Sequence, residues 1–249
     1  MTRKITLLTA ALLSASMASA DDGCDDACQA ARNAQDPLAP VTAIMTDNTA
    51  TESGTQFQLQ PVHTIKGDNG NLILRGVVPL QFGKDAGVGD VVLQAFYVPG
   101  NQTGFKFGFG PQISLKTRTH ESIAGLGNAI GAAAVGFGFA GNWSYGGIVS
   151  HMVNEQNTSV TSFQPIVFYN LPSAEGVYVG YNNTISYTDN GPAATNGWNV
   201  PVGVSIGKTM VQGNGGAVDA SIGAYAVYRD ALGDWDGQIK FSINYFFGN

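Results

Sequence analysis

Residues 104–116 read G-F-K-F-G-F-G-P-Q-I-S-L-K, and this ribbon decides the fold. Side chains on a strand point alternately to its two faces. One face carries Phe105, Phe107, Phe109, Pro111, Ile113 and Leu115, and the other carries Lys106, Gly108, Gly110, Gln112, Ser114 and Lys116. The polar face is small and hydrated, while the apolar face has no helix to pack against. Since the same pattern recurs along most of the chain, we predict a sheet closed into a barrel, with lipid outside and water inside.

The composition agrees with a membrane barrel. The chain has 249 residues, of which 33 are glycine and only 12% are charged, and its mean hydropathy is +0.03. A lipid-facing surface averaged with a polar lumen gives such a middling value. A soluble sandwich or lipocalin-like barrel would place charges on the exposed face and large apolar residues inside. Here the inner face is mostly Gly, Ser, Asn and Gln with scattered Lys and Asp, which is the reverse pattern.

The first twenty residues have the features of a secretory signal peptide. Arg3 and Lys4 precede a short apolar core at residues 5–13, and Ala18-Ser19-Ala20 forms a small-residue cleavage site before Asp21. The core is too short to span a bilayer. We therefore predict export from a Gram-negative cytoplasm, with a mature chain that begins at Asp21 and has 10 basic and 18 acidic residues, for a net charge of −8. A secreted soluble β protein is the alternative.

Residues 21–40 form a tail with a short helix at 25–35, which ends before Pro37 and is a candidate lumen plug. This tail holds the only cysteines, Cys24 and Cys28, which could form a local disulfide in an exported protein. The neighbouring aspartates invite a metal-site interpretation, but no histidine is nearby, so we expect neither a metal nor another cofactor.

We expect residues 41–249 to form the barrel. Eleven alternating segments are clear, and most have the roughly 9 to 11 residues that a tilted transmembrane strand needs. Because single-chain bacterial barrels have even strand numbers, and short turns alternate here with longer loops, residues 41–47 are the candidate for a weak first strand of twelve. A ten-stranded barrel, or a 41–47 segment that threads the lumen, are the alternatives. The eleven segments are 55–65, 71–82, 90–98, 104–116, 129–140, 143–154, 158–171, 176–188, 198–208, 217–228 and 235–247.

Short segments from residue 36 to the C-terminus resemble a family of Gram-negative outer-membrane proteins that is labelled MetA-pathway of phenol degradation, or simply transporter. The resemblance implies an outer-membrane barrel with a transport role, and it supplies no catalytic or ligand-binding residues. The chain ends Phe247-Gly248-Asn249, whereas outer-membrane barrels commonly present a terminal aromatic residue to the barrel-assembly machinery. The matching pieces are Asp36-Pro37-Leu38-Ala39, Gln60-Pro61-Val62, Leu72-Ile73-Leu74-Arg75, Val78-Pro79-Leu80, Gly87-Val88-Gly89-Asp90, Gly108-Phe109-Gly110-Pro111, Trp143-Ser144-Tyr145-Gly146, Gln164-Pro165 and Trp198-Asn199-Val200-Pro201.

Strand alternation also predicts which polar residues line the lumen. Charged rings can select ions, but paired Lys and Asp residues inside a barrel more often rigidify it. The candidate pore-lining residues are Arg75, Asp90, Gln94, Lys106, Gln112, Lys116, Asn182, Asp219, Asp236, Gln238 and Lys240.

The favoured function is passive uptake or efflux of a small solute, and the idea that this solute is hydrophobic or aromatic rests only on the family label. A plugged barrel with a structural or surface-interaction role is the alternative. A rim lipid hydrolase using His151 is third, and it is disfavoured because Ser150 points to the opposite face. We expect outer-membrane lipid and lipopolysaccharide as surroundings, and no nucleic acid, since no basic stripe is present. The oligomeric state stays open.

Overall fold

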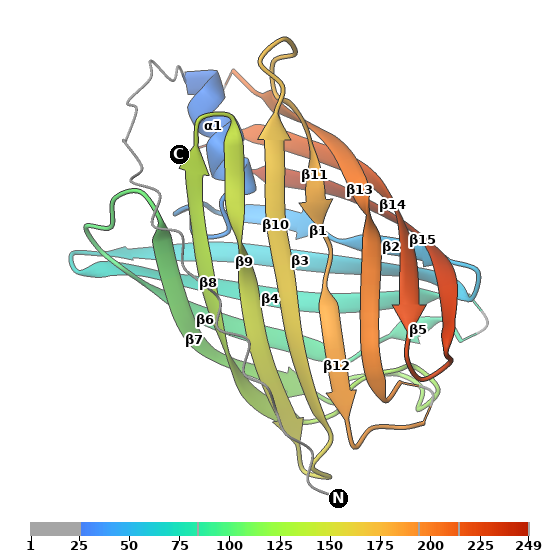
Figure 1. Cartoon of the computed structure of the whole chain (residues 1–249). Helices are drawn as coiled ribbons and strands as arrows, with labels where there is room; N and C mark the ends of the chain where they lie inside the picture. Colours follow the sequence, from blue (N-terminus) through green and yellow to red (C-terminus); the bar gives the residue numbers. More distant parts are fainter. Residues whose placement is uncertain (1–25, 84, 194, 214, 249) are drawn as a thin grey trace, which may run out of the picture.

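The computed structural model describes residues 26–83, 85–193, 195–213 and 215–248. One helix, α1 (Asp26–Gln35), precedes an antiparallel sheet that curls into a barrel (Figure 1). The strand segments are β1 (Ala43–Thr46), β2 (Asn48–Thr51), β3 (Gly54–Gly67), β4 (Gly70–Phe82), β5 (Gly87–Val88), β6 (Val91–Pro99), β7 (Lys106–Leu115), β8 (Ala129–Ala140), β9 (Trp143–Asn154), β10 (Ser159–Asn170), β11 (Val177–Asn182), β12 (Ile185–Asp189), β13 (Gly197–Val211), β14 (Ala217–Arg229) and β15 (Asp234–Phe246).

These fifteen segments make twelve barrel strands, because β1/β2, β5/β6 and β11/β12 are each one strand with a break. The first strand closes the barrel: β1 pairs with both β3 and β15, and β2 does the same. The prediction of twelve strands is confirmed, and the ten-strand alternative is wrong. The threading alternative is also wrong for residues 43–46, which pair within the sheet, and this strand continues to Thr51.

Two of the three breaks place a polar side chain where it can bond inside the barrel. Asp47, between β1 and β2, forms an ion pair with Lys240 at 3.0 Å. Asn183, between β11 and β12, donates a hydrogen bond to Gln238 at 2.8 Å. The breaks were not predicted, since strand periodicity carries no signal for a residue that leaves the alternation to find a partner.

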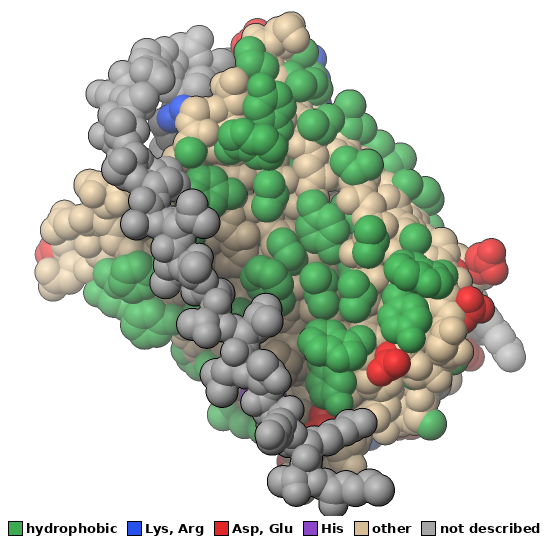
Figure 2. All heavy atoms as spheres, viewed as in Figure 1, with side chains coloured by type: hydrophobic (Ala, Val, Ile, Leu, Met, Phe, Trp, Pro, Cys, Tyr) green, Lys and Arg blue, Asp and Glu red, His purple; other side chains and the backbone are tan. Residues whose placement is uncertain are grey.

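The outer wall is apolar, as predicted from the ribbon. Phe105, Phe107 and Phe109 are each about half exposed on this face, whereas Gln112 is 2% exposed on the other. Figure 2 shows apolar side chains spread over the wall that faces the viewer, with acidic side chains at its margin. A lipid environment accounts for so many exposed aromatic and aliphatic side chains, which water would penalise.

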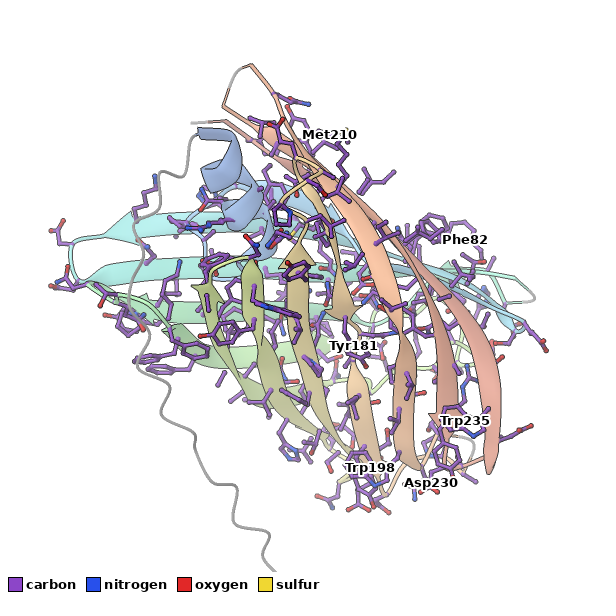
Figure 3. The ribbon with its side chains drawn as sticks, turned by 45° about the horizontal axis from the view of Figure 1, so that its top comes forward. Phe82, Tyr181, Trp198, Met210, Asp230 and Trp235 are labelled. Atoms are coloured by element: carbon purple, nitrogen blue, oxygen red, sulfur yellow. The ribbon has the colours of Figure 1, made fainter. Side chains whose placement is uncertain are left out.

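Aromatic side chains pair across neighbouring strands near the strand ends. The ring centroids of Tyr187 and Trp198 are 5.0 Å apart, and those of Tyr228 and Trp235 are 5.5 Å apart. Figure 3 shows Trp198, Asp230 and Trp235 together at the end of the barrel opposite Met210. We call this the long-loop end, and the other the α1 end, because α1 and the C-terminus lie there (Figure 1). The aromatic belt expected at a membrane interface is therefore present at the long-loop end.

The α1 end of the lumen holds an apolar core, which the sequence analysis did not foresee. Leu38 is 2% exposed and packs with inward-facing residues of several strands, among them Phe96, Phe137 and Phe168. The glycine at position 108 makes room for it, since a Cβ there would lie 2.9 Å from Leu38 Cδ2. The polar face of the 104–116 ribbon is thus covered by protein at this end, and not by water as predicted.

The remaining N-terminal predictions fall mostly outside the described residues. The signal peptide at 1–20 and Cys24 lie there, and of Cys28 only the backbone, within α1, is described. The helix expected at 25–35 is confirmed as Asp26–Gln35. No helix in the described part of the chain is long and apolar enough to cross a membrane.

Candidate solute site

A cavity of about 120 Å³ lies inside the barrel. Residues 34–37, 39 and 41, from the end of α1 and the chain that follows it, line part of it; we call residues 34–41 the N-terminal segment. Asp47 and Lys240 face the same cavity as an ion pair, and Arg75 lies beside them. Because the chain before β1 supplies part of the lining, the N-terminal segment occupies the lumen at the α1 end.

A row of glutamines leads along the inner face of β3 to Arg75. Gln58 donates to Gln56 and Gln60 donates to Gln58, both at 3.1 Å. Arg75 Nη2 then donates to Gln60 Oε1 at 2.6 Å. The spacing of two along β3 places these amides on one face, so that a continuous polar path reaches the guanidinium.

A second, larger hollow lies on the outer wall, with a volume of about 750 Å³. Two prolines that face outward, Pro61 and Pro111, border it, and both interrupt strand pairing because proline has no N–H to donate. The β3–β4 ladder passes from Leu59↔Val78 to Val62↔Arg75, and the β6–β7 ladder is interrupted beside Pro111. The strand pairing of the wall is therefore interrupted at two places, between β3 and β4 and between β6 and β7.

The apolar lining of the hollow also depends on a missing side chain. A Cβ at Gly76 would lie 3.4 Å from Pro61 Cγ and 3.8 Å from Leu93 Cδ2. The remaining apolar lining comes from neighbouring outward-facing residues, including Ile44, Leu74, Ile113 and Phe247. The hollow thus offers a lipid-facing apolar surface, with polar groups behind it.

Arg75 and Val62 line both the outer hollow and the inner cavity. Gln94 on β6, which pairs with β4, and Gln112 on β7, the next strand along, also line the hollow and hydrogen-bond to each other at 2.8 Å. Arg75 is therefore the polar contact shared by the membrane side and the lumen side of the wall. Strand alternation gave Arg75, Gln94 and Gln112 as inward-facing, but gave no indication that a hollow opens beside them.

The other predicted lumen residues form local clusters. Asp219 is buried and accepts hydrogen bonds from Tyr178 at 3.0 Å, Thr209 at 2.9 Å and Asn244 at 3.2 Å. Asn182 accepts from Gln164 at 2.6 Å. These residues brace the lumen wall through local bonds, and Asn182 and Asp219 also line the inner cavity.

Four further candidates lie near the barrel ends or bind across the lumen. Lys106 forms an ion pair with Asp36 of the N-terminal segment, and Gln238 accepts the bond from Asn183. Asp236 pairs with Arg229 at 2.9 Å. Lys116 follows the end of β7 and pairs with Glu121 at 2.8 Å in the adjoining loop.

The loop at residues 117–128 is tied back to the break between β5 and β6. Asp90, at this break, accepts hydrogen bonds from Gly127 N at 2.7 Å and from Arg118 N at 3.3 Å. Ile123 of the loop is buried. Asp90 therefore anchors the loop at the long-loop end. Both of its carboxylate oxygens bind loop N–H groups, so they are not available to a solute.

The residues considered for hydrolysis do not form a catalytic pair. His151 Nδ1 lies 2.9 Å from Thr161 Oγ1 on the outer wall, whereas Ser150 Oγ bonds to Ser162 Oγ at 2.6 Å. In the described residues, no group of three or more His, Cys, Asp or Glu side chains is placed to hold a metal ion.

The residues that the sequence analysis missed are Pro61, Gly76 and Pro111. A signal for them was present, because proline within a transmembrane strand must break a ladder hydrogen bond. What the sequence could not give is the register, which places Gly76 between the two proline-bearing strands.

No family model and no curated protein matches this chain. Among solved structures, it is similar to the COG4313 outer membrane channel from Pseudomonas putida F1, with a TM-score of 0.54 at 12% identity over 84% of this chain and 96% of that one. It is also similar to the KdgM porin, with a TM-score of 0.51 at 13% identity over 82% of this chain and 99% of that one. The chain therefore has the fold of porin-like outer-membrane channels.

Proposed function

We propose that the protein is a passive channel of the bacterial outer membrane for small, mainly apolar solutes, with the α1 end in the periplasm. The signal-peptide features of residues 1–20 and the apolar outer wall support the location. Shorter turns at the α1 end support the orientation, because barrels of this kind keep short turns in the periplasm. The sequence resemblance to a family labelled for phenol degradation is consistent with an aromatic solute.

One observation carries the proposal: Arg75 and Val62 line both the outer hollow and the inner cavity. A solute dissolved in the membrane can contact the hollow without crossing water. Past Arg75 it would reach the cavity, where residues 34–41 lie between it and the α1 end. We therefore propose that solute exchanges through the wall, and that the N-terminal segment moves when solute leaves toward the periplasm.

Uptake of a hydrophobic dye would test this function. Gram-negative cells exclude the neutral dye N-phenyl-1-naphthylamine, which fluoresces once it enters the envelope. Cells expressing the protein should take up the dye faster than cells expressing a barrel of unrelated specificity at equal abundance. Purified protein in planar bilayers should show only small ionic conductance, because the N-terminal segment fills part of the lumen. Equal dye uptake together with no conductance or solute flux would overturn the proposal.

A structural barrel without transport is the second candidate, and the cross-lumen contacts favour it. Asn183–Gln238 and Lys106–Asp36 each tie separate parts of the lumen together, and Lys240–Asp47 ties the last strand to the first strand beside it. On this alternative, deleting the protein would weaken the envelope against detergent while leaving dye uptake unchanged. The two measurements, made on one deletion strain, separate the candidates.

A further inference from the structure

Among the basic residues on the strands and loops of the barrel's inner side, Arg75 is distinguished by its lack of an acidic partner within the described residues. Lys106, Lys240, Arg118 and Arg229 each have a carboxylate oxygen within 4.0 Å, but Arg75 has none among the described residues. The side-chain hydrogen bond that Arg75 makes to a described residue goes to the neutral amide of Gln60. Asp47, whose charge acts on Arg75, is itself paired with Lys240. Asp47 thus faces two cations, Lys240 and Arg75, so that this group of side chains carries one positive charge in excess.

Three buried polar atoms beside the hollow also lack a hydrogen-bond partner in the part of the chain that the structure describes. They are Arg75 Nε, Gln112 Nε2 and Gln94 Oε1. The residues are direct neighbours across β4, β6 and β7, since Arg75 pairs with Gln94 and Gln94 pairs with Gln112. Gln112 is 2% exposed. Buried polar groups are nearly always satisfied in native proteins, so such a cluster indicates a ligand or water that completes it.

The chemistry of these groups, together with the hollow, defines a molecule of two parts. The two free donors, Arg75 Nε and Gln112 Nε2, and the positive charge of Arg75 suit an anionic head, and guanidinium groups match the planar fork of a carboxylate. The free acceptor, Gln94 Oε1, can receive a hydroxyl group or a water molecule beside it. The outer hollow, lined by Pro61, Leu93 and their apolar neighbours, suits a hydrocarbon or aromatic body.

The charge count favours a single negative charge. A carboxylate neutralises Arg75, whereas a phosphate monoester would bring a charge of about −1.5 to −2 and leave part of it unpaired in a poorly hydrated wall. A cationic amphiphile would meet the guanidinium as a like charge.

We propose that the outer hollow and the Arg75–Gln94–Gln112 cluster form a binding site for amphipathic monocarboxylates, with the carboxylate at Arg75 and the apolar body in the hollow. This inference rests on the proposed channel function and names the solute class of the same site.

Equilibrium binding tests the inference without requiring transport. The full-length mature protein is placed in lipid nanodiscs, and calorimetry follows the binding of octanoate, 1-octanol and octyltrimethylammonium. Empty nanodiscs give the lipid partitioning to subtract. Octanoate should bind roughly tenfold or more tightly than 1-octanol, as expected for one charge-assisted contact, and octyltrimethylammonium should bind most weakly. Equal affinities for the three probes, or no saturable octanoate binding, would overturn the inference.

Variants then place the binding at Arg75. Arg75→Met should abolish the preference for octanoate over 1-octanol while leaving 1-octanol affinity within about twofold, because the hollow is untouched. Arg229→Met is the matched control, since it removes an arginine at the end of β14 that lines neither the hollow nor the cavity, and it should keep the preference. Should Arg75→Met fail to fold, Gln112→Met provides the second test: it removes one free donor and should reduce octanoate affinity alone. A preference that survives both Arg75→Met and Gln112→Met would overturn the site.

The same proteins separate this inference from the proposed function. If dye uptake depends on the protein but octanoate binding does not depend on Arg75, the proposed channel stands and the carboxylate site is overturned. Octanoate binding that depends on Arg75, in a protein that transports neither dye nor octanoate, would support the site and reject the channel.

Discussion

Lys106, on the polar face of the ribbon at residues 104–116, donates a hydrogen bond to Asp36 in the chain that precedes the barrel. The Asp36 side chain is 1% exposed, and its second oxygen accepts the backbone N–H of Leu38 at 2.8 Å. Leu38 in turn packs over Gly108, two residues further along the same strand. The ribbon that has an apolar lipid face therefore uses its polar face to hold the N-terminal segment inside the lumen.

Lys106→Met should loosen this segment. The substitution leaves the Asp36 carboxylate buried without its cation, which typically costs about 3 kcal/mol. If this cost falls on the docking of residues 34–41, their opening equilibrium rises by about a hundredfold. Hydrogen exchange should then accelerate at residues 34–41, and bilayer conductance should increase.

Lys116→Met is the control for Lys106→Met, because it breaks the exposed pair with Glu121 at the opposite end of the same strand. This control should change neither the exchange at residues 34–41 nor the conductance. A folded Lys106→Met barrel with unaltered exchange in the segment would show that the apolar packing of Leu38 alone holds it.

Gly76→Leu should fill the outer hollow. The backbone at Gly76 is not in the left-handed region, and a Cβ there meets Pro61 and Leu93 at contact distance, so the larger side chain projects into the hollow. Protein-dependent dye uptake should fall at least about fivefold, with the barrel still folded, since a lipid-facing leucine carries no burial penalty. Ala224→Leu places the same side chain on the outer face of β14, away from the hollow, and should leave uptake unchanged. Normal dye uptake by Gly76→Leu would exclude the hollow as the entrance.

Periodicity predicted the barrel well because it reports which face of a strand meets lipid. The strands at 129–140 and 143–154 were predicted to the residue, since their ends coincide with a tight turn at Gly141 and Asn142. The first strand needed a different argument, the parity of turns, and its break at Asp47 stayed hidden because the Lys240 that binds it is distant in sequence. The same limit applies to the site. Arg75 could be assigned to the inner face, but its missing acidic partner is a property of the assembled lumen.

Tyr178→Phe should destabilise the barrel without changing its fold. The Tyr178 hydroxyl lies 3.0 and 3.1 Å from the two oxygens of Asp219, so its removal deprives a buried acid of a donor. Thr209 and Asn244 still bind Asp219, which limits the loss in unfolding free energy to about 2 kcal/mol, as expected for a hydrogen bond to a charged group. Denaturant unfolding in detergent micelles would measure this loss. Tyr245→Phe removes a longer contact to Gln212, at 3.4 Å, and should lower the unfolding free energy much less. Equal losses in the two variants would mean that the Tyr178–Asp219 contact contributes no more than this long one.

Acid should release part of the loop at residues 117–128 through Glu121. The hydrogen bond and charge of Lys116, together with the charge of Arg118, lower the pKa of Glu121 below its ordinary value of 4.5. A carboxyl group whose pKa is lowered by folding stabilises the folded loop at pH values above that ordinary value, and this contribution disappears as the pH falls through the lowered pKa. Since the Glu121 side chain is exposed, the effect should stay local to the loop.

Hydrogen exchange at residues 117–123, corrected for intrinsic rates, should therefore rise between about pH 5 and pH 3. In Glu121→Gln the exchange should already be raised at pH 7 and should show less additional change on acidification, because glutamine has no carboxyl group to titrate. Asp90 still holds Gly127 and Arg118 in both proteins, so the loop should stay partly anchored. Identical pH profiles for the two proteins would assign the acid response to another group.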